Sequence, residues 1–274
     1  MSAGFECRAE WILVGTLEKK TVQLSTINLI MCTFKERGAI ARTMGADSTA
    51  AGLTEEQAAV YDRQLRVWGV EAQRRLGASR ILVAGLTGLA AEACKNVALA
   101  GVGAVVLYDD GAPAKDAAPG NFLAAAGLAD AAGTPDAEGL TVAAATAATL
   151  REMNPFGEIS ILVGPSDLSG IDAAAVTGCD AVLVAGCPLA VAERINDACR
   201  EAGSAFFHGE CRATSANFFA DLGPDFRYTV EKRSAEKEAD AGAVDTAMSA
   251  SFVTLREATR CGWKSLGDGR EGGV

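Results

Sequence analysis

Two glycines and one aspartate have the spacing of a nucleotide-binding unit. Gly85 and Gly88 enclose a short turn, and Asp109 lies at the end of the next apolar run. Glycines let a backbone approach phosphate closely, a following helix N-terminus supplies unbonded N–H groups, and the acidic side chain can accept a bond from a ribose hydroxyl. Ala90 stands where a third glycine of the pattern would be. From these residues alone, nucleotide binding and a plain strand–turn–helix connection both stay open.

The cysteines follow neither a metal-binding nor a disulfide pattern. Eight cysteines are scattered along the chain without any Cys-x-x-Cys pair, and His208 is the single histidine. Zinc ligands normally come in close pairs, so we predict no metal site. Cys187 and Cys211 are expected in loops near strand ends, where a buried or incidental thiol is favoured over a nucleophile. Several of the cysteines lie in apolar runs, which indicates a reducing compartment.

Composition and charge narrow the classes of partner. The chain carries a formal net charge of −10, with 49% hydrophobic and 22% charged residues. This profile is typical of a globular domain, and the acidic balance disfavours contact with nucleic-acid backbones. No apolar stretch approaches the ~20 residues of a membrane-spanning helix, and the N-terminus lacks the features of a secretory signal. We therefore expect neither nucleic acid nor a membrane as partner.

The elements that would position the turn alternate between strand and helix. Apolar runs at 80–84 and 104–108 predict buried strands on either side of a helix over 89–100. Such a unit crosses over right-handedly and makes its two strands parallel. The alternation continues with a helix at 141–153, strands at 159–163 and 181–185, a helix at 190–202 and a strand at 205–207. We predict an α/β, Rossmann-like fold, with a mostly parallel sheet and helices on both faces.

The pattern changes after this alternation. Residues 215–221 and 226–231 are separated by Gly223-Pro224-Asp225 and predict an antiparallel hairpin appended to the sheet. The following stretch is charged, rich in alanine and poor in large apolar groups, which favours a flexible linker. The predicted division of the chain is 1–50 as an N-terminal extension of unknown role, 51–232 as the α/β domain, 233–250 as the linker, and 251–274 as a partial C-terminal segment with a disordered tail.

The run Tyr61–Gly69 resembles the opening of the adenylation half-domains of ubiquitin-like-protein activating enzymes. Further segments similar to that family are 95–103 after the glycine turn, 121–123, and 150–155 with its final asparagine–proline. The likeness covers about residues 53–264 and implies a ThiF/MoeB-type adenylation fold. Members of the family continue past Trp263 with further helices and strands, so the resemblance implies a C-terminally truncated form.

Three charged positions of the family's catalytic half have uncharged counterparts here. By the resemblance, Gly120 stands at the position of an arginine, Val142 at that of a lysine, and the stretch 185–189 lacks a magnesium-binding aspartate. Formation of an acyl-adenylate develops negative charge on phosphate and requires nearby cations. The resemblance therefore implies an inactive adenylation domain in which Gly85, Gly88 and Asp109 form a vestigial nucleotide site, while ATP and Mg²⁺ are bound mainly by a partner subunit.

The resemblance assigns a different role to Arg63. It implies that this arginine reaches in trans to the ATP of the partner, with Asp62 and Gln64 positioning the segment. A guanidinium suits this role because it is permanently charged and bonds two oxygens at once. From the residues alone, Arg63 and Arg66 on a solvated helix face remain the alternative.

The resemblance also separates two kinds of subunit. The short hairpin and the return of the family pattern at Ser251 are similar to the non-thioester subunits of SUMO-activating enzymes, and less so to the regulatory subunit for the NEDD-type modifier. The resemblance then implies, as partners, the large thioester-bearing subunit, SUMO and, indirectly, the SUMO-conjugating enzyme. It also implies a nuclear location with a cytoplasmic pool. Two alternatives stay open: a nucleotide-binding oxidoreductase that uses Gly85, Gly88 and Asp109 for NAD, and a non-functional fragment left by truncation.

Overall fold

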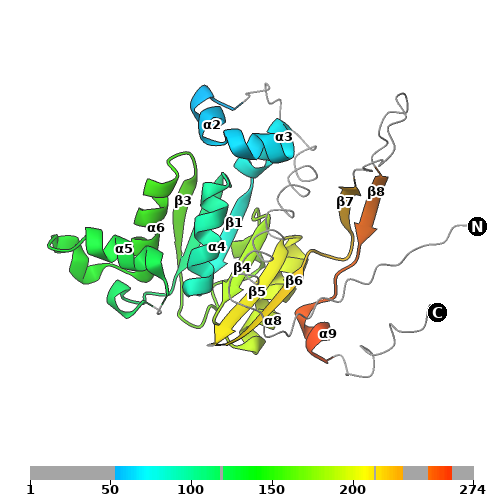
Figure 1. The fold of residues 1–274 in the computed structure, drawn as a ribbon. Helices are drawn as coiled ribbons and strands as arrows, with labels where there is room; N and C mark the ends of the chain where they lie inside the picture. The colour runs from blue at the N-terminus through cyan, green and yellow to red at the C-terminus, as the bar shows by residue number, and fades with distance from the viewer. Residues whose placement is uncertain (1–52, 118–119, 213, 231–245, 261–274) are drawn as a thin grey trace, which may run out of the picture.

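The computed structural model describes residues 53–117, 120–212, 214–230 and 246–260, and its centre is a six-stranded sheet (Figure 1). The strands are β1 (Arg80–Ala84), β2 (Ala104–Asp109), β3 (Glu158–Val163), β4 (Ala181–Ala185), β5 (Ala205–Arg212), β6 (Ser215–Asp221), β7 (Phe226–Val230) and β8 (Thr246–Ala250). The helices are α2 (Glu55–Val60), α3 (Asp62–Gly77), α4 (Gly88–Leu99), α5 (Phe122–Asp130), α6 (Val142–Met153), α7 (Ala173–Val176), α8 (Leu189–Ala202) and α9 (Leu255–Arg260), with 3₁₀ turns η1 (Ala114–Asp116) and η2 (Pro135–Gly139). The alternation of strand and helix from residue 80 to residue 207 is confirmed.

The strand order makes the fold a doubly wound sheet. The order is β3–β2–β1–β4–β5–β6, and every neighbouring pair up to β5 is parallel. Ile81 of β1 lies opposite Val105 of β2 on one side and opposite Ala181 of β4 on the other. The chain therefore winds outward from β1 in one direction and from β4 in the other. In open sheets of this kind, ligand sites lie beyond the carboxyl ends of the two central strands.

Helices cover both faces of the sheet, as predicted, because alternate strand residues point to opposite sides. In β1, Ile81 and Val83 belong to the core beneath α4 and α6, whereas Leu82 and Ala84 belong to the core beneath α7 and α8. Figure 1 shows α4 and α6 on one face and α8 on the other. The helical contribution to the first core comes largely from alanines, and such small side chains let helix and sheet backbones approach closely.

The predicted hairpin between residues 215–221 and 226–231 is wrong, although both segments are strands. β6 pairs with β5 in an antiparallel manner, and β7 pairs with β8 in a separate two-stranded sheet. The reason lies in β5, which extends to Arg212 instead of ending at residue 207 and so offers a long sheet edge. Pairing with that edge partly buries the β6 aromatics, since Phe218 stacks on Phe207 with ring centroids 6.2 Å apart.

The predicted flexible linker, residues 233–250, needs a second correction. Its last five residues form β8, which pairs with β7 from Thr246 opposite Val230 to Ala250 opposite Phe226. Phe226 is also in edge contact with Phe252, with ring centroids 6.2 Å apart. The remainder of the predicted linker, the whole predicted N-terminal extension and the predicted tail lie outside the described residues.

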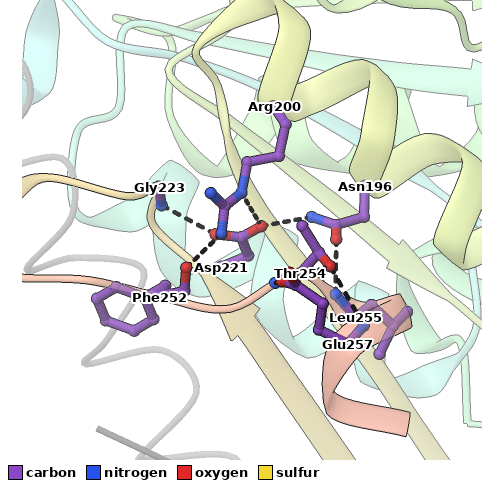
Figure 2. A network of polar contacts seen from close by, with 8 residues as sticks. All are labelled: Asn196, Arg200, Asp221, Gly223, Phe252, Thr254, Leu255 and Glu257. Carbon is purple, nitrogen blue, oxygen red and sulfur yellow. Dashed lines mark hydrogen bonds and ion pairs between the residues drawn. The ribbon is translucent and has the colours of Figure 1, made fainter. Parts of the chain in front are cut away.

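A buried carboxylate organises the attachment of this C-terminal segment. Asp221, at the end of β6, is 1% exposed and lies 2.6 Å from Nε of Arg200 on α8. Its carboxylate also accepts hydrogen bonds from Nδ2 of Asn196 at 2.8 Å and from the backbone N–H of Gly223 at 2.9 Å. We call Asn196, Arg200, Asp221 and Gly223 the Asp221 cluster, which Figure 2 shows from close by.

The Asp221 cluster bonds the backbone that follows β8. Arg200 donates a second hydrogen bond to the carbonyl oxygen of Phe252, and Oδ1 of Asn196 accepts one from the backbone N–H of Leu255 at 2.8 Å. Leu255 is buried in the core beneath α8, and the contacts are visible in Figure 2. Two polar side chains of α8 therefore fix the start of α9 against the main domain.

Candidate functional site

The glycine turn lies where the two halves of the sheet diverge. Gly85 directly follows β1 with φ of 70°, and a Cβ atom there would lie 1.7 Å from the carbonyl oxygen of Ala185 at the end of β4. Gly186 follows β4 with φ of 64°. Both residues need the left-handed backbone region that glycine adopts readily. The lack of a side chain at Gly85 therefore lets the turn lie close to β4, the neighbouring strand of the same chain.

The second glycine of the turn is packed against another loop. Gly88 is the first residue of α4, and a Cβ atom there would lie 3.0 Å from the carbonyl oxygen of Gly120. Asn121 is 3% exposed and donates from Nδ2 to the carbonyl oxygen of Leu86 at 2.8 Å. The loop at Gly120–Asn121 is therefore held directly against the turn.

Asp109 lies at the carboxyl end of β2, as the sequence pattern predicted, but its carboxylate has partners within the chain. Oδ1 accepts a hydrogen bond from the backbone N–H of Gly111 at 2.9 Å, and Oδ2 accepts one from Oγ1 of Thr141 at 2.7 Å. Thr141 also caps α6 by accepting a bond from the N–H of Ala144 at 3.2 Å. Asp109 thereby ties the end of β2 to the start of α6, and a role in binding ribose stays a prediction.

The three positions that the resemblance singled out as lacking charge lie near this turn or in its supporting core. Gly120 has φ of 92°, so its backbone conformation is one that an arginine rarely adopts. Val142 is 7% exposed and packs in a small core with Ala124 and Ala145. Cys187, just after β4, is 7% exposed, and burial raises the pKa of its thiol to about 11. At neutral pH these three side chains offer no charge to a phosphate or to a metal ion.

The run Tyr61–Gly69 docks onto the C-terminal end of α4 through its inward side chains. Tyr61 is 3% exposed, and its hydroxyl accepts a hydrogen bond from Nδ2 of Asn154 at 2.8 Å. Gln64 donates from Nε2 to the carbonyl oxygen of Leu99 at 3.1 Å. These partners are the carbonyl end of α4 and the asparagine that closes α6. The prediction that Gln64 positions this segment is supported by its hydrogen bond.

A second set of contacts holds the next turn of α3. Trp68 donates from Nε1 to Oε1 of Gln73 at 3.0 Å, and Gln73 donates from Nε2 to the carbonyl oxygen of Ala100 at 2.8 Å. A Cβ atom at Gly101 would lie 2.6 Å from that same Nε2. α3 bends at Gly69, where φ is 79° and the backbone is not helical. The orientation of α3 is therefore set by buried polar contacts.

The outward side chains of the same run include its two arginines. Arg63 is exposed, and within the described residues it forms no hydrogen bond or ion pair. Arg66 lies 3.0 Å from the carboxylate of Asp62, with both side chains largely exposed. Asp62 therefore contacts Arg66, while Arg63 projects a guanidinium that is available to a group outside this part of the chain.

Thiols and metal ligands add no further site in the described ranges. Cys94, Cys179, Cys187 and Cys199 are buried, and Cys211 is exposed. Burial also raises the pKa of Cys94, to about 12. Across residues 53–117, 120–212, 214–230 and 246–260, no three histidine, cysteine, aspartate or glutamate side chains are grouped so that they could hold a metal ion. No helix in these ranges is both long and apolar enough to cross a membrane.

A doubly wound sheet with this turn and this preceding helix defines a protein class. The ThiF family matches residues 61–252, and the chain belongs to that family. Among named relatives, SUMO-activating enzyme subunit 1B-1 of Arabidopsis thaliana is 35% identical over 216 residues, which are 78% of this chain and 62% of the relative. SUMO-activating enzyme subunit 1 of Homo sapiens is 30% identical over 191 residues, which are 70% of this chain and 52% of the relative. The chain therefore spans less than two thirds of the length of these relatives.

Solved structures with a related shape include the tRNA N6-threonylcarbamoyladenosine dehydratase TcdA of E. coli. That chain is 17% identical, the match covers 57% of this chain and 61% of the other, and the TM-score is 0.45.

Proposed function

We propose that this chain is the non-thioester subunit of a SUMO-activating enzyme. The proposal is supported by membership of the ThiF family and by relatives named SUMO-activating enzyme subunit 1 in a plant and in vertebrates. Those names favour SUMO over the NEDD-type modifier. The partner in this proposal is the large thioester-bearing subunit, which binds ATP and SUMO, and the SUMO-conjugating enzyme acts afterwards. We place this assembly in the nucleus, with a cytoplasmic pool.

The reaction explains why an additional cation is useful. A carboxylate oxygen at the C-terminus of SUMO attacks the α-phosphorus of ATP, the bond to the bridging oxygen breaks, and pyrophosphate leaves with the electron pair. Mg²⁺ bound by the partner would neutralise part of the phosphate charge. Because negative charge grows on the leaving phosphates in the transition state, a positioned guanidinium there lowers the barrier. In this scheme Arg63 supplies that guanidinium from across the subunit interface.

The observation that carries the proposal is that Arg63 is exposed and has no partner among the described residues, while the opposite side of its helix is bonded to the domain. Tyr61, Gln64 and Gln73 hold α3 on the domain by hydrogen bonds to residues outside the helix. Arg63, by contrast, has no partner among the described residues. A rigid helix that presents one uncompensated guanidinium is suited to act on an anion held by another chain, because the charge is pre-positioned.

The residues around the chain's own glycine turn do not fit ATP with Mg²⁺. Gly120, Val142 and Cys187 supply no charge, and Asp109 is bonded to Gly111 and Thr141. Adenylation without cations near the phosphates would face a large electrostatic barrier. We therefore propose that the isolated chain does not form an adenylate and that ATP and Mg²⁺ bind mainly to the partner.

The first prediction tests Arg63 against a neighbouring arginine. We expect Arg63→Ala to lower the rate of SUMO-adenylate formation by about 10-fold or more, since arginine fingers in phosphoryl transfer contribute about 10³–10⁵. Arg66→Ala is the matched control, because Arg66 lies on the same helix but is paired with Asp62. The measurement is ATP–pyrophosphate exchange by the large SUMO-activating subunit mixed with SUMO and each variant.

Two results would contradict the proposal. One is that the wild-type chain adds nothing to the exchange rate or to the thioester yield of the large subunit. The other is that the chain alone, given SUMO and ATP with Mg²⁺, exchanges pyrophosphate. If Arg63→Ala and Arg66→Ala lowered the exchange rate equally, Arg63 would have no specific role.

A further inference from the structure

A cleft of about 630 Å³ lies at the end of the sheet opposite the glycine turn. Its walls come from residues in the ranges 178–180, 199–204 and 222–227, and we call it the amino-end cleft. Residues 178–180 directly precede β4, and residues 202–204 directly precede β5. Protein interiors contain few voids larger than a water molecule, so a cleft of this size is suited to hold a ligand or a further segment of chain.

The lining of the amino-end cleft is rich in apolar side chains. These side chains come from Cys179, Cys199, Ala202, Leu222, Pro224 and Phe226. Leu222 belongs to one core of the domain and Cys199 to the other, so the cleft opens where the two cores meet the end of the sheet. An apolar occupant would therefore extend both cores.

The charged side chains of the amino-end cleft balance one another. Two are acidic, Asp180 and Asp225, and two are basic, Arg200 and Arg227. Arg227 lies 2.9 Å from Asp225, and Arg200 lies 2.6 Å from the buried carboxylate of Asp221. A charged occupant would lose its hydration without gaining a free partner among these groups, which is costly. The cleft therefore favours an occupant that is both apolar and uncharged.

One stretch of the chain outside the described residues has this chemistry. Residues 21–34 contain no charged side chain, although lysines flank them at positions 20 and 35. Their apolar members include Ile27, Leu29, Ile30 and Phe34. The stretches 231–245 and 261–274, by contrast, contain several acidic and basic residues each. Burial of residues 21–34 is favourable because it removes apolar surface from water.

Residues 21–34 can reach the amino-end cleft without passing round the sheet. Leu53, the first described residue, lines a small cavity together with Gly103 and Gly157, which precede β2 and β3. These strands are parallel to β4 and β5, so Leu53 lies at the same end of the sheet as the cleft, where Figure 1 also shows α2 and α3. Residues 35–52 can span up to about 60 Å when extended, which exceeds the diameter of a small domain, about 30 Å.

We propose that residues 21–34 dock in the amino-end cleft of their own chain. The contact does not depend on the proposed function, and it gives part of the N-terminal extension a place in the fold. The tether gives the segment a local concentration on the order of millimolar, so a modest affinity keeps it docked. A second copy offers the same segment only at its bulk concentration, which favours docking within one chain.

The first test changes one residue of this segment in the full chain. Ile30→Asp places a charge in the segment, and Ile12→Asp is the matched control, because it places the same charge in another apolar piece of the N-terminal extension. Hydrogen–deuterium exchange is measured for peptides from 199–204 and 222–227, with α5 as the reference for an intact fold. We expect Ile30→Asp to raise exchange in the cleft peptides by about 10-fold or more, as the loss of one buried isoleucine predicts. Ile12→Asp should leave it unchanged.

The second test locates the segment directly. Phe34 is replaced by the photoreactive analogue benzoylphenylalanine in a mixture of isotopically light and heavy full chains. We expect crosslinks to residues 199–204 or 222–227 within one chain. Crosslinks that join a light and a heavy chain would make a second copy the occupant, and the absence of crosslinks to the cleft would place the segment elsewhere. Either result overturns the proposal, as does an Ile30→Asp variant whose cleft peptides exchange like those of the wild type or of Ile12→Asp.

Discussion

Replacement of Asp221 by alanine removes the carboxylate on which three donors converge. In the native chain these donors are Nε of Arg200 at 2.6 Å, Nδ2 of Asn196 at 2.8 Å and the N–H of Gly223 at 2.9 Å. Asp221 is almost entirely buried, and the Arg200 side chain is 22% exposed. The variant therefore leaves a mostly buried guanidinium beside an apolar methyl group.

The size of the effect follows from this burial. Removal of one partner from a buried ion pair costs about 3–5 kcal/mol, because the remaining charge and donors keep their desolvation cost. A domain is typically stable by only about 5–15 kcal/mol, so the loss is a large fraction of the total. Arg200 also bonds the carbonyl oxygen of Phe252, so disturbance of its side chain should loosen the segment before α9.

The assay is equilibrium unfolding in urea at pH 7, with Asp225→Ala as the matched control. Asp225 pairs with Arg227 at 2.9 Å, but the two side chains are 56% and 72% exposed, and such surface pairs contribute about 0–1 kcal/mol. We expect Asp221→Ala to lower the free energy of unfolding by about 3–5 kcal/mol, and Asp225→Ala to leave it nearly unchanged. Trypsin cleavage after Arg256 in α9 should become faster only in the Asp221 variant.

The reasoning would be refuted by equal and small losses in the two aspartate variants. It would also be refuted by a large loss of stability in Asp221→Ala with no change in cleavage at α9, since that result would separate the carboxylate from the C-terminal segment. Asp221→Asn keeps an acceptor for Gly223 but not the charge for Arg200. The loss of unfolding free energy in Asp221→Asn should lie between the losses in Asp221→Ala and Asp225→Ala.

Two further predictions concern the turn and the single histidine. Gly85→Ala should destabilise the fold by about 4 kcal/mol or more, because its Cβ atom would overlap the carbonyl oxygen of Ala185, whereas Gly203→Ala, with φ of 73° and open space, should cost only about 1–2 kcal/mol. Urea unfolding distinguishes the two, and similar losses would contradict the packing role of Gly85. His208 is buried, and its Nε2 has no hydrogen-bond partner among the described residues; burial lowers the pKa of His208, although Glu210 opposes the shift. Because the unfolded chain then takes up the proton first, stability should fall as the pH drops below about 6.5. Melting from pH 7.5 to 5.5 should show a smaller fall in His208→Phe, and an unchanged slope would contradict this prediction.

The sequence by itself determined the class of fold and the place of the turn. Continuous apolar runs such as residues 81–84 and Ala181–Ala185 have few ways to be buried other than in a sheet covered on both faces. Thr54 and Gln57 form a capping box at the start of α2, and Thr141 caps the helix that the sequence predicted from that residue. These signals are local, since each depends on residues within one helical turn or one strand.

Strand pairing at the C-terminal side was decided only by tertiary structure. A short glycine–proline segment between two apolar runs predicts a hairpin, yet Ser215–Asp221 pairs with the extended β5, and Phe226–Val230 pairs with a strand far along the chain. The energies that select the partner come from contacts between side chains of paired strands, such as Phe218 on Phe207, and not from the turn sequence alone. Local turn preferences cannot rank those contacts.

The two faces of the Tyr61–Gly69 run were likewise separated only by the fold. The sequence identified Arg63 and the residues around it, but not which side chains point inward. The structure commits Tyr61 and Gln64 to the ends of α6 and α4 and leaves Arg63 and Val67 outside. In the same way, Asp109 has the position of a ribose ligand in the sequence and bonds Thr141 in the structure. Which atoms a side chain bonds depends on the neighbours that distant segments bring to it, and that arrangement exists only in the folded chain.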